Sequence, residues 1–341
     1  MYLLETIEKL QFELSSYCNS KCPQCPRYDL LGNVQKDLNL AHLDFNTIKK
    51  IPIEKMKNLK LIHMYGNFGD SLMHPALNNI IDFFHRQKIE ISTNASLRSK
   101  EWWYELGKNK NVSVVFCIDG LEDTHHLYRR NTSYKKIMEN AKSFIKAGGD
   151  AQWQFIVFKH NEHQVEQVRA LSKKLGFRRI GFTYSNRFDV AGKFKVYENN
   201  KYLYDLEKST GQTLLRERLG ANVGQKYWKK LNENKSEITC VWKEQKSIYI
   251  HSDGTVYPCC MLGSVNSGKK IEQLMLKKLV KDFRNVDLNY KTFEQIISSE
   301  VFTKTLPESF SGKPFSHPVC IEWCNKATGK YAHEDLNTVN T

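Results

Sequence analysis

The sequence predicts an α/β fold built around a mainly parallel sheet. The chain has 341 residues, and 40% of them are hydrophobic, which is enough for one large core and a smaller one. Along the first half, short apolar runs rich in β-branched and aromatic residues alternate with longer runs of helical periodicity. Strands and helices that alternate in this way form parallel βα units.

We expect six such units in residues 1–190. Strands are predicted at residues 10–16, 60–65, 89–93, 112–117, 153–158 and 179–184. Helices are predicted between them at residues 44–51, 75–87, 99–108, 134–147 and 163–176. Six βα units suit a partial (β/α)6 barrel that resembles part of a TIM barrel, in which functional groups collect at the carboxyl ends of the strands.

Two more segments follow this core. Residues 191–235 are polar, and we predict a connector that contains some helix. Residues 236–341 are predicted to form a small α+β domain. Within it, residues 247–258 predict two short strands joined by a Ser-Asp-Gly turn, which places Cys259 just past the second strand.

Composition narrows the class of protein. The hydrophobic content excludes global disorder. No apolar run approaches the ~18 residues of a membrane-spanning helix, and the N-terminus does not resemble a signal peptide, so we expect a cytoplasmic protein with no membrane partner. The net charge of +14 has two explanations: attraction to an acidic partner, or a general enrichment in lysine and asparagine spread along the chain.

Nine cysteines carry the strongest chemical signal, because clustered thiols in a cytoplasmic chain indicate metal ligands more than disulfides. Cys18, Cys22 and Cys25 are spaced C-x3-C-x2-C directly after the first predicted strand. Structural zinc sites are closed by four ligands, and iron–sulfur clusters normally take four thiolates. Three thiolates therefore predict a cluster with one open iron; a zinc site completed by a distant histidine such as His63 is the alternative.

The C-x3-C-x2-C motif and the segments after it resemble the radical S-adenosylmethionine (radical SAM) enzymes. Residues 64–75 are similar to the glycine-rich loop that binds the SAM amino group, and Arg129 occupies the place of an arginine that binds the SAM carboxylate. Gln24 stands where many members have an aromatic residue against the adenine. The resemblance implies that SAM binding involves Tyr17, Gln24, Gly66, Asn67, Gly69, Asp70, Ser92, Asn94 and Arg129.

The second cysteine group resembles the shortened C-terminal extension called a twitch domain, whose longer relative is the SPASM domain. The implied ligands of one auxiliary [4Fe–4S] cluster are Cys240, Cys259, Cys320 and Cys324. The spacing from Gly254 favours Cys259 over Cys260, and a four-cysteine zinc site remains the alternative. The expected cofactors are thus two [4Fe–4S] clusters and SAM.

The resemblance implies an oxidoreductase or epimerase that cleaves SAM to a 5′-deoxyadenosyl radical and removes hydrogen from an unactivated C–H bond. Cys117 is a candidate hydrogen-atom donor or a small buried residue, and Asp119 is a candidate base or SAM ligand or part of an Asp-Gly turn. The auxiliary cluster would accept an electron, and a flavodoxin or ferredoxin would supply one.

Because Cys18 lies so close to the N-terminus, we expect no peptide-recognition domain and favour a small polar substrate of the sugar, cyclitol or nucleotide type. A peptide- or protein-modifying enzyme that crosslinks, oxidises or epimerises a ribosomal peptide is the alternative. We expect no nucleic-acid partner. A non-catalytic iron–sulfur or zinc protein that binds nucleic acid is therefore only the remote alternative.

Overall fold

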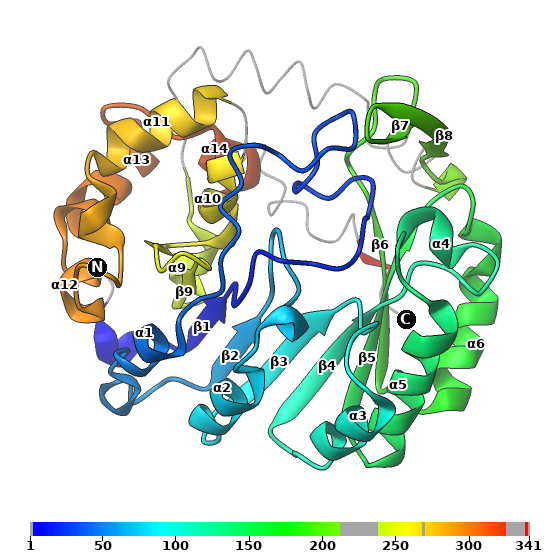
Figure 1. Ribbon diagram of the computed structural model, residues 1–341. Coiled ribbons are helices and arrows are strands. Elements are labelled where there is room, and N and C mark those ends of the chain that lie inside the picture. Colours follow the sequence, from blue (N-terminus) through cyan, green and yellow to red (C-terminus); the bar gives the residue numbers. More distant parts are fainter. Residues whose placement is uncertain (1–2, 212–237, 268–269, 325–337, 340–341) are drawn as a thin grey trace.

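The computed structural model describes residues 3–211, 238–267, 270–324 and 338–339. In this part of the chain, nine strands form one curved sheet (Figure 1). Six parallel strands follow one another in chain order: β1 (Lys9–Phe12), β2 (Leu61–Met64), β3 (Lys88–Thr93), β4 (Val112–Cys117), β5 (Asp150–Val157) and β6 (Arg179–Tyr184). The predicted partial (β/α)6 barrel is confirmed.

The connecting helices lie on the outer face of the curved sheet (Figure 1). They are α1 (Phe45–Lys49), α2 (Leu77–Phe83), α3 (Lys100–Gly107), α5 (Tyr134–Lys146) and α6 (Val165–Leu175). The short helix α4 (His125–Tyr128) lies instead near the carboxyl ends of the strands, where Tyr128 packs with Cys22. The core forms where they meet the sheet: the fully buried rings of Trp103, Phe116 and Phe144 from α3, β4 and α5 lie 5.2–6.1 Å apart, centroid to centroid. Alternate residues of a strand point to opposite sides, and the other face of the sheet is more polar: it carries Glu90 and Ser92 of β3 and Gln152 and Gln154 of β5.

The end of the first strand differs from its prediction at residues 10–16. Only Lys9–Phe12 pair within the sheet. Leu14 O accepts from Leu43 N, and Ser16 N donates to Ala41 O, so the extended chain leaves the sheet to pair with residues 41–43. The first predicted strand is thus shorter by residues 13–16: Glu13 N still donates to Ile250 O of β9, and Leu14 and Ser16 find their backbone partners outside the sheet.

The C-terminal region extends the same sheet. The predicted hairpin is confirmed as β9 (Ser247–Ile250) and β10 (Val256–Tyr257), which are antiparallel, with Gly254 at a φ of +94° in the turn. Strand β9 also pairs in parallel with β1, and β11 (Thr338–Val339) pairs antiparallel with β6. The remaining helices are α9 (Val241–Glu244), α10 (Cys260–Gly263), α11 (Lys270–Val280), α12 (Phe293–Ile297), α13 (Leu306–Phe310) and α14 (Pro318–Cys324).

Short turns complete the described chain. Single 3-10 turns occupy Leu4–Thr6, Ile53–Lys55, Ser71–Met73, Glu162–Gln164, Ser264–Ser267 and Phe283–Val286, and a π-helical turn spans Val301–Thr305. No helix in the described ranges is both long and apolar enough to cross a membrane.

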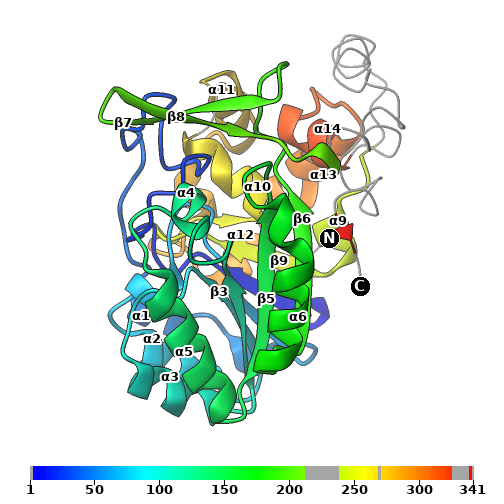
Figure 2. The same cartoon turned by 90° about the vertical axis from the view of Figure 1, so that its right-hand side faces the viewer.

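The segment predicted as a connector with some helix begins instead with a β-ribbon. Strands β7 (Lys193–Glu198) and β8 (Lys201–Glu207) pair antiparallel and lie across the top of the molecule in the view of Figure 2. The physical reason is the alternation of charged and apolar side chains in Lys193–Glu198, together with a two-residue turn at Asn199 and Asn200. Both asparagines have positive φ, 49° and 68°, as tight hairpin turns require. The rest of that segment, residues 212–235, lies outside the described residues.

Candidate functional site

The C-x3-C-x2-C loop lies directly beyond the carboxyl end of β1. Cys22 is buried, and Cys18 and Cys25 are half-buried. Ser20 Oγ lies 3.0 Å from Cys22 Sγ, and Ser20 N donates to Cys18 Sγ at 3.4 Å. Burial, together with the smaller effects of the nearby Asp70, Cys22 and Cys25, raises the pKa of Cys18 to about 12. The three thiols therefore share one largely enclosed space.

Two hydrogen-bond donors face these thiols, Asn94 just past the end of β3 and Arg129 just past the end of α4. Arg129 Nη1 lies 3.6 Å from Cys22 Sγ, and Asn94 Nδ2 lies 3.7 Å from Cys18 Sγ. A cationic and an amide donor beside three thiols fit an anionic cluster and the polar end of a ligand bound to it. In the part of the chain that is described, no three histidine, cysteine or acidic groups converge closely enough to hold a single metal ion.

Asp119 holds Arg129 in place. Its carboxylate is fully buried; one oxygen accepts from Arg129 Nε at 2.6 Å and the other from Ile156 N at 2.6 Å. Burial raises the pKa of Asp119, and the guanidinium opposes this effect. Because both oxygens have partners, the geometry favours an anchoring role for Asp119, and its role as a base stays a prediction.

Ser92 lies two residues before Asn94, near the end of β3, and Cys117 lies two residues before Asp119, at the end of β4. Both side chains are therefore deeper in the barrel than Asn94 and Asp119. Ser92 Oγ is 3.3 Å from Cys117 Sγ. Burial raises the pKa of the Cys117 thiol, which keeps it protonated, the form that a hydrogen-atom donor needs. The position is compatible with the predicted role of Cys117 and does not test it.

The glycine-rich loop is shaped by its own backbone. A Cβ on Gly66 would lie 2.3 Å from Gly69 O, and one on Gly69 would lie 1.8 Å from Ser15 O, so both positions require glycine. Asp70 accepts from Leu72 N, Asn94 N and the Thr93 hydroxyl. Asn67, a predicted SAM ligand, has a partner in the C-terminal region: its Nδ2 donates to Cys260 O at 2.8 Å.

Two further predicted SAM-binding residues, Tyr17 and Gln24, also have partners within the chain. Tyr17 stacks on His42, with ring centroids 4.7 Å apart. Gln24 is buried, where Nε2 donates to Arg187 O at 2.7 Å and Oε1 accepts from Ser185 Oγ at 2.6 Å. Gln24 thus fastens the cysteine loop to the segment after β6, and this structural use competes with its predicted contact to SAM.

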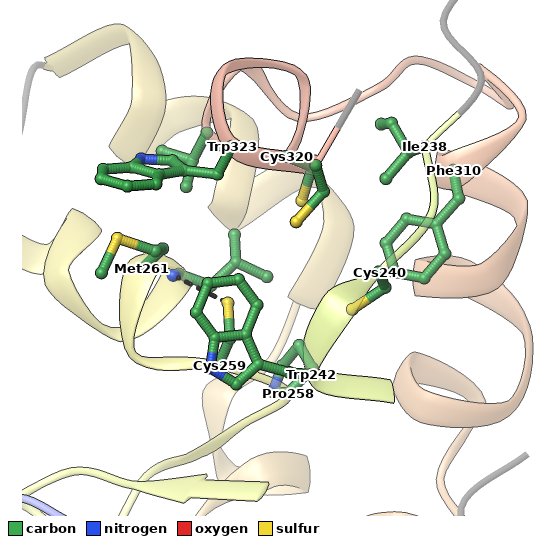
Figure 3. A pocket seen from close by; sticks show the side chains of 12 residues that line it. Ile238, Cys240, Trp242, Pro258, Cys259, Met261, Phe310, Cys320 and Trp323 are labelled. Carbon is green, nitrogen blue, oxygen red and sulfur yellow. Dashed lines mark hydrogen bonds between the residues drawn. The ribbon is translucent and has the colours of Figure 1, made fainter. Parts of the chain in front are cut away.

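The four cysteines of the second group line one apolar pocket. Figure 3 shows Cys240, Cys259 and Cys320 around a common space, and Cys324 also belongs to its lining. The other lining residues are Ile238, Trp242, Pro258, Met261, Leu262, Phe310, Val319 and Trp323. Thr239 N donates to Cys324 O at 3.0 Å, which ties the segment before Cys240 to α14. Four thiols in a water-excluding pocket are a donor set that fits a fully ligated iron–sulfur cluster.

Sequence reasoning missed two acidic groups, the buried Glu13 and the half-buried Glu90. Glu13 lies beneath the glycine-rich loop, and its only signal was an acidic residue inside the apolar run 10–16. Glu90 points into the barrel, where it accepts from Tyr65 OH and Gln152 Nε2. His63 Nε2 is 3.7 Å from Glu90 Oε1, so His63 faces this polar cluster, and burial lowers its pKa to about 4.

Comparison with known families identifies the C-terminal region. Residues 240–326 match the model of the SPASM family, described as an iron-sulfur cluster-binding domain. The match includes all four cysteines of the second pocket. The C-terminal part of the chain is therefore an iron–sulfur domain of the SPASM type.

Two curated proteins are similar in sequence. A cysteine-type anaerobic sulfatase-maturating enzyme of Clostridium novyi (strain NT) is 23% identical over 52% of this chain and 51% of its own length. A tungsten-containing aldehyde ferredoxin oxidoreductase cofactor-modifying protein of Pyrococcus furiosus is 25% identical over 73% of this chain and 70% of its own length. The chain thus matches about half the length of the first relative.

Solved structures share the fold at low identity. The anSMEcpe protein with bound AdoMet aligns with a TM-score of 0.56 and 18% identity, covering 93% of this chain and 86% of its own. SuiB of Streptococcus suis bound to the precursor peptide SuiA gives a TM-score of 0.54 and 17% identity, over 88% of this chain and 66% of its own. These likenesses establish the fold.

Proposed function

We propose that this chain, which carries a SPASM iron–sulfur domain on a core with the radical SAM fold, is a radical SAM enzyme that oxidises or crosslinks a peptide or protein substrate. The observation that carries the proposal is the loop of Cys18, Cys22 and Cys25 at the carboxyl end of the sheet, faced by Arg129 and Asn94. When bound, the SAM-ligated cluster supplies a 5′-deoxyadenosyl radical that removes hydrogen from an unactivated C–H bond.

The chain's own residues would bind the two clusters and orient SAM. Cys18, Cys22 and Cys25 would hold one cluster, at which SAM would bind. Arg129, fixed by Asp119 at 2.6 Å, is placed to pair with the SAM carboxylate, and it stays protonated because Asp119 raises its pKa. Cys240, Cys259, Cys320 and Cys324 would hold an auxiliary cluster shielded from water, suited to accept one electron.

A peptide substrate is better supported than the small polar substrate that the sequence favoured. Of the proteins similar to this chain, one is named for sulfatase maturation, and SuiB was solved with a precursor peptide. Because the Pyrococcus relative is named for cofactor modification, the experiment also tests small molecules as the alternative substrates. A flavodoxin or ferredoxin as electron donor stays a prediction.

The test begins with anaerobically reconstituted protein. Iron, sulfide and 5′-deoxyadenosine formed with SAM and dithionite are measured for the wild type and for the Cys18→Ala/Cys22→Ala/Cys25→Ala variant. We expect about eight irons in the wild type, about four in the variant, and nucleoside from the wild type alone. Nucleoside formation is then compared with a synthetic peptide library and with a panel of sugars, cyclitols and nucleotides.

Stimulation by peptides, with a mass change in the peptide, would support the proposal. Stimulation confined to the small molecules would overturn the substrate assignment and leave the radical SAM assignment intact. Absence of SAM cleavage by a wild type that holds eight irons would overturn both.

A further inference from the structure

Glu13 joins the glycine-rich loop to the C-terminal hairpin at the base of the candidate site. It follows β1 directly and is fully buried. Its Oε1 accepts from Phe68 N at 2.7 Å and from Gly69 N at 3.1 Å, two backbone amides of the glycine-rich loop. Hydrogen bonds to a buried carboxylate are strong, so the loop backbone is held firmly on this side.

The other carboxylate oxygen faces the hairpin. Glu13 Oε2 accepts from Tyr249 OH at 2.5 Å, and His251 Nε2 lies 3.5 Å away. His251 is oriented in turn by Asp253, whose Oδ1 is 3.0 Å from Nδ1. One carboxylate therefore contacts the loop through one oxygen and strand β9 with its turn through the other.

The surrounding contacts restrict the movement of both the glycine-rich loop and the C-terminal hairpin. Asn67 Nδ2 donates to Cys260 O, next to the predicted ligand Cys259, and lies 3.3 Å from Tyr249 OH. A Cβ on Gly263 would lie 2.3 Å from the Tyr249 ring, so that ring fits tightly against α10. The loop, β9 and the start of α10 thus form one contiguous contact network.

We propose that Glu13 is a positioning residue that couples the two sites: the glycine-rich loop keeps its SAM-binding shape because Glu13 fixes it to the docked SPASM hairpin through Tyr249. The inference rests on the proposed function for the identity of the ligand. It concerns the chain's own hydrogen bonds, so it has a readout that needs no SAM.

The primary variant is Tyr249→Phe, which removes the hydroxyl and keeps the ring against Gly263. Glu13→Gln and the double variant complete a cycle, and Tyr202→Phe on the exposed ribbon is the matched control. Hydrogen exchange of the segment 66–70 is measured in SAM-free protein, and SAM affinity is measured by equilibrium binding to reconstituted protein. Iron content and melting temperature are recorded alongside.

We expect Tyr249→Phe and Glu13→Gln each to accelerate exchange in segment 66–70 and to weaken SAM binding, both on the order of 10-fold, the size expected when one partner of a buried hydrogen bond is removed. The double variant should resemble the single ones, because all break the same link. Iron content should stay at the wild-type value.

Unchanged loop exchange in both single variants would overturn the inference. A strictly additive double variant would also overturn it, because independent effects need no shared link. A wild type that binds no SAM would refute the proposed function instead, and the exchange data would still decide whether Glu13 couples loop and hairpin.

Discussion

Two adjacent cysteines illustrate how single residues divide the roles in this chain. Cys259 lines the apolar pocket with Cys240 and Cys320, and its sulfur accepts from Leu262 N at 3.4 Å. Cys260 faces β1 of the core: burial raises its pKa to about 11, and a hydrogen bond from Gln11 opposes the rise. The neighbours in sequence therefore lie in two different environments.

We predict that Cys259→Ala loses the auxiliary cluster and Cys260→Ala retains it. The first change should lower the iron content of reconstituted protein from about eight to about four, because the auxiliary cluster would lose one of its four thiolates and, unlike the first cluster, has no SAM to take that place. The second removes a small buried side chain outside the pocket. Iron and sulfide analysis checks both, with Cys117→Ala as a further control at about eight irons. Equal iron loss in the two variants would contradict the assignment.

At this scale the sequence was informative where partners are local. The spacing of Cys18, Cys22 and Cys25 predicts a shared space because a short loop brings its own residues together. The role of Glu13 was not predictable, since Phe68 is 55 residues away and Tyr249 is 236 residues away. The partners of Asn67 could not be foreseen either, because they belong to a hairpin whose docking no local pattern encodes.

Among the elements, the β7–β8 ribbon supports the cysteine loop. Glu198, at the end of β7, forms ion pairs with Lys21 at 2.7 Å and Arg130 at 2.9 Å. Asn200 N donates to Leu31 O at 3.0 Å. Alternation and the paired asparagines were present in the sequence as hairpin signals, and the polar composition of the segment masked them.

We predict that Gly32→Ala loosens the cysteine loop. Gly32 has a φ of +77°, and an added Cβ would lie 2.2 Å from Tyr197 O on the ribbon, so the change combines backbone strain with a backbone clash. We expect a loss of about 1–2 kcal/mol or more in the free energy of unfolding, with faster hydrogen exchange in residues 18–35 and weaker retention of the first cluster. Urea unfolding, exchange and iron analysis provide the measurements.

Gly148→Ala is the matched control for that change. Its φ is +82°, but the added Cβ would meet only the flexible end of Lys110. Gly148→Ala should therefore lower the free energy of unfolding through backbone strain without loosening the cysteine loop. If both variants accelerated exchange in residues 18–35 to the same extent, the ribbon contact would not be what holds the loop.

At the scale of the whole molecule, the sequence predicts only part of the strand order. The strands predicted at 112–117 and 179–184 are found at those bounds as β4 and β6, and six βα units imply their chain order. The placement of β9 beside β1 had no signal, because the pairing joins segments far apart in the chain. The predicted boundary near residue 236 therefore separates two sequence regions that share one sheet.

This shared sheet predicts that the core does not fold stably without the C-terminal region. Ile248, Tyr249 and Ile250 are fully buried against the core. Burying a large apolar side chain contributes about 2 kcal/mol, so their loss removes roughly 6 kcal/mol, which is comparable with the ~5–15 kcal/mol of net stability of a typical domain. A chain ending at residue 211 would also expose the edge of β1, which invites association.

We therefore expect a chain of residues 1–211 to form soluble aggregates or oligomers in size-exclusion chromatography, with rapid hydrogen exchange in β1. A chain of residues 1–324 keeps β9 and loses β11, whose two residues pair with β6 at the opposite edge. Because so little pairing is removed there, it should elute in the same oligomeric state as the full chain, with β1 protected. A monomeric 1–211 chain with a protected β1 would show that the core folds alone, and the coupling through Glu13 would then act between two independently stable units.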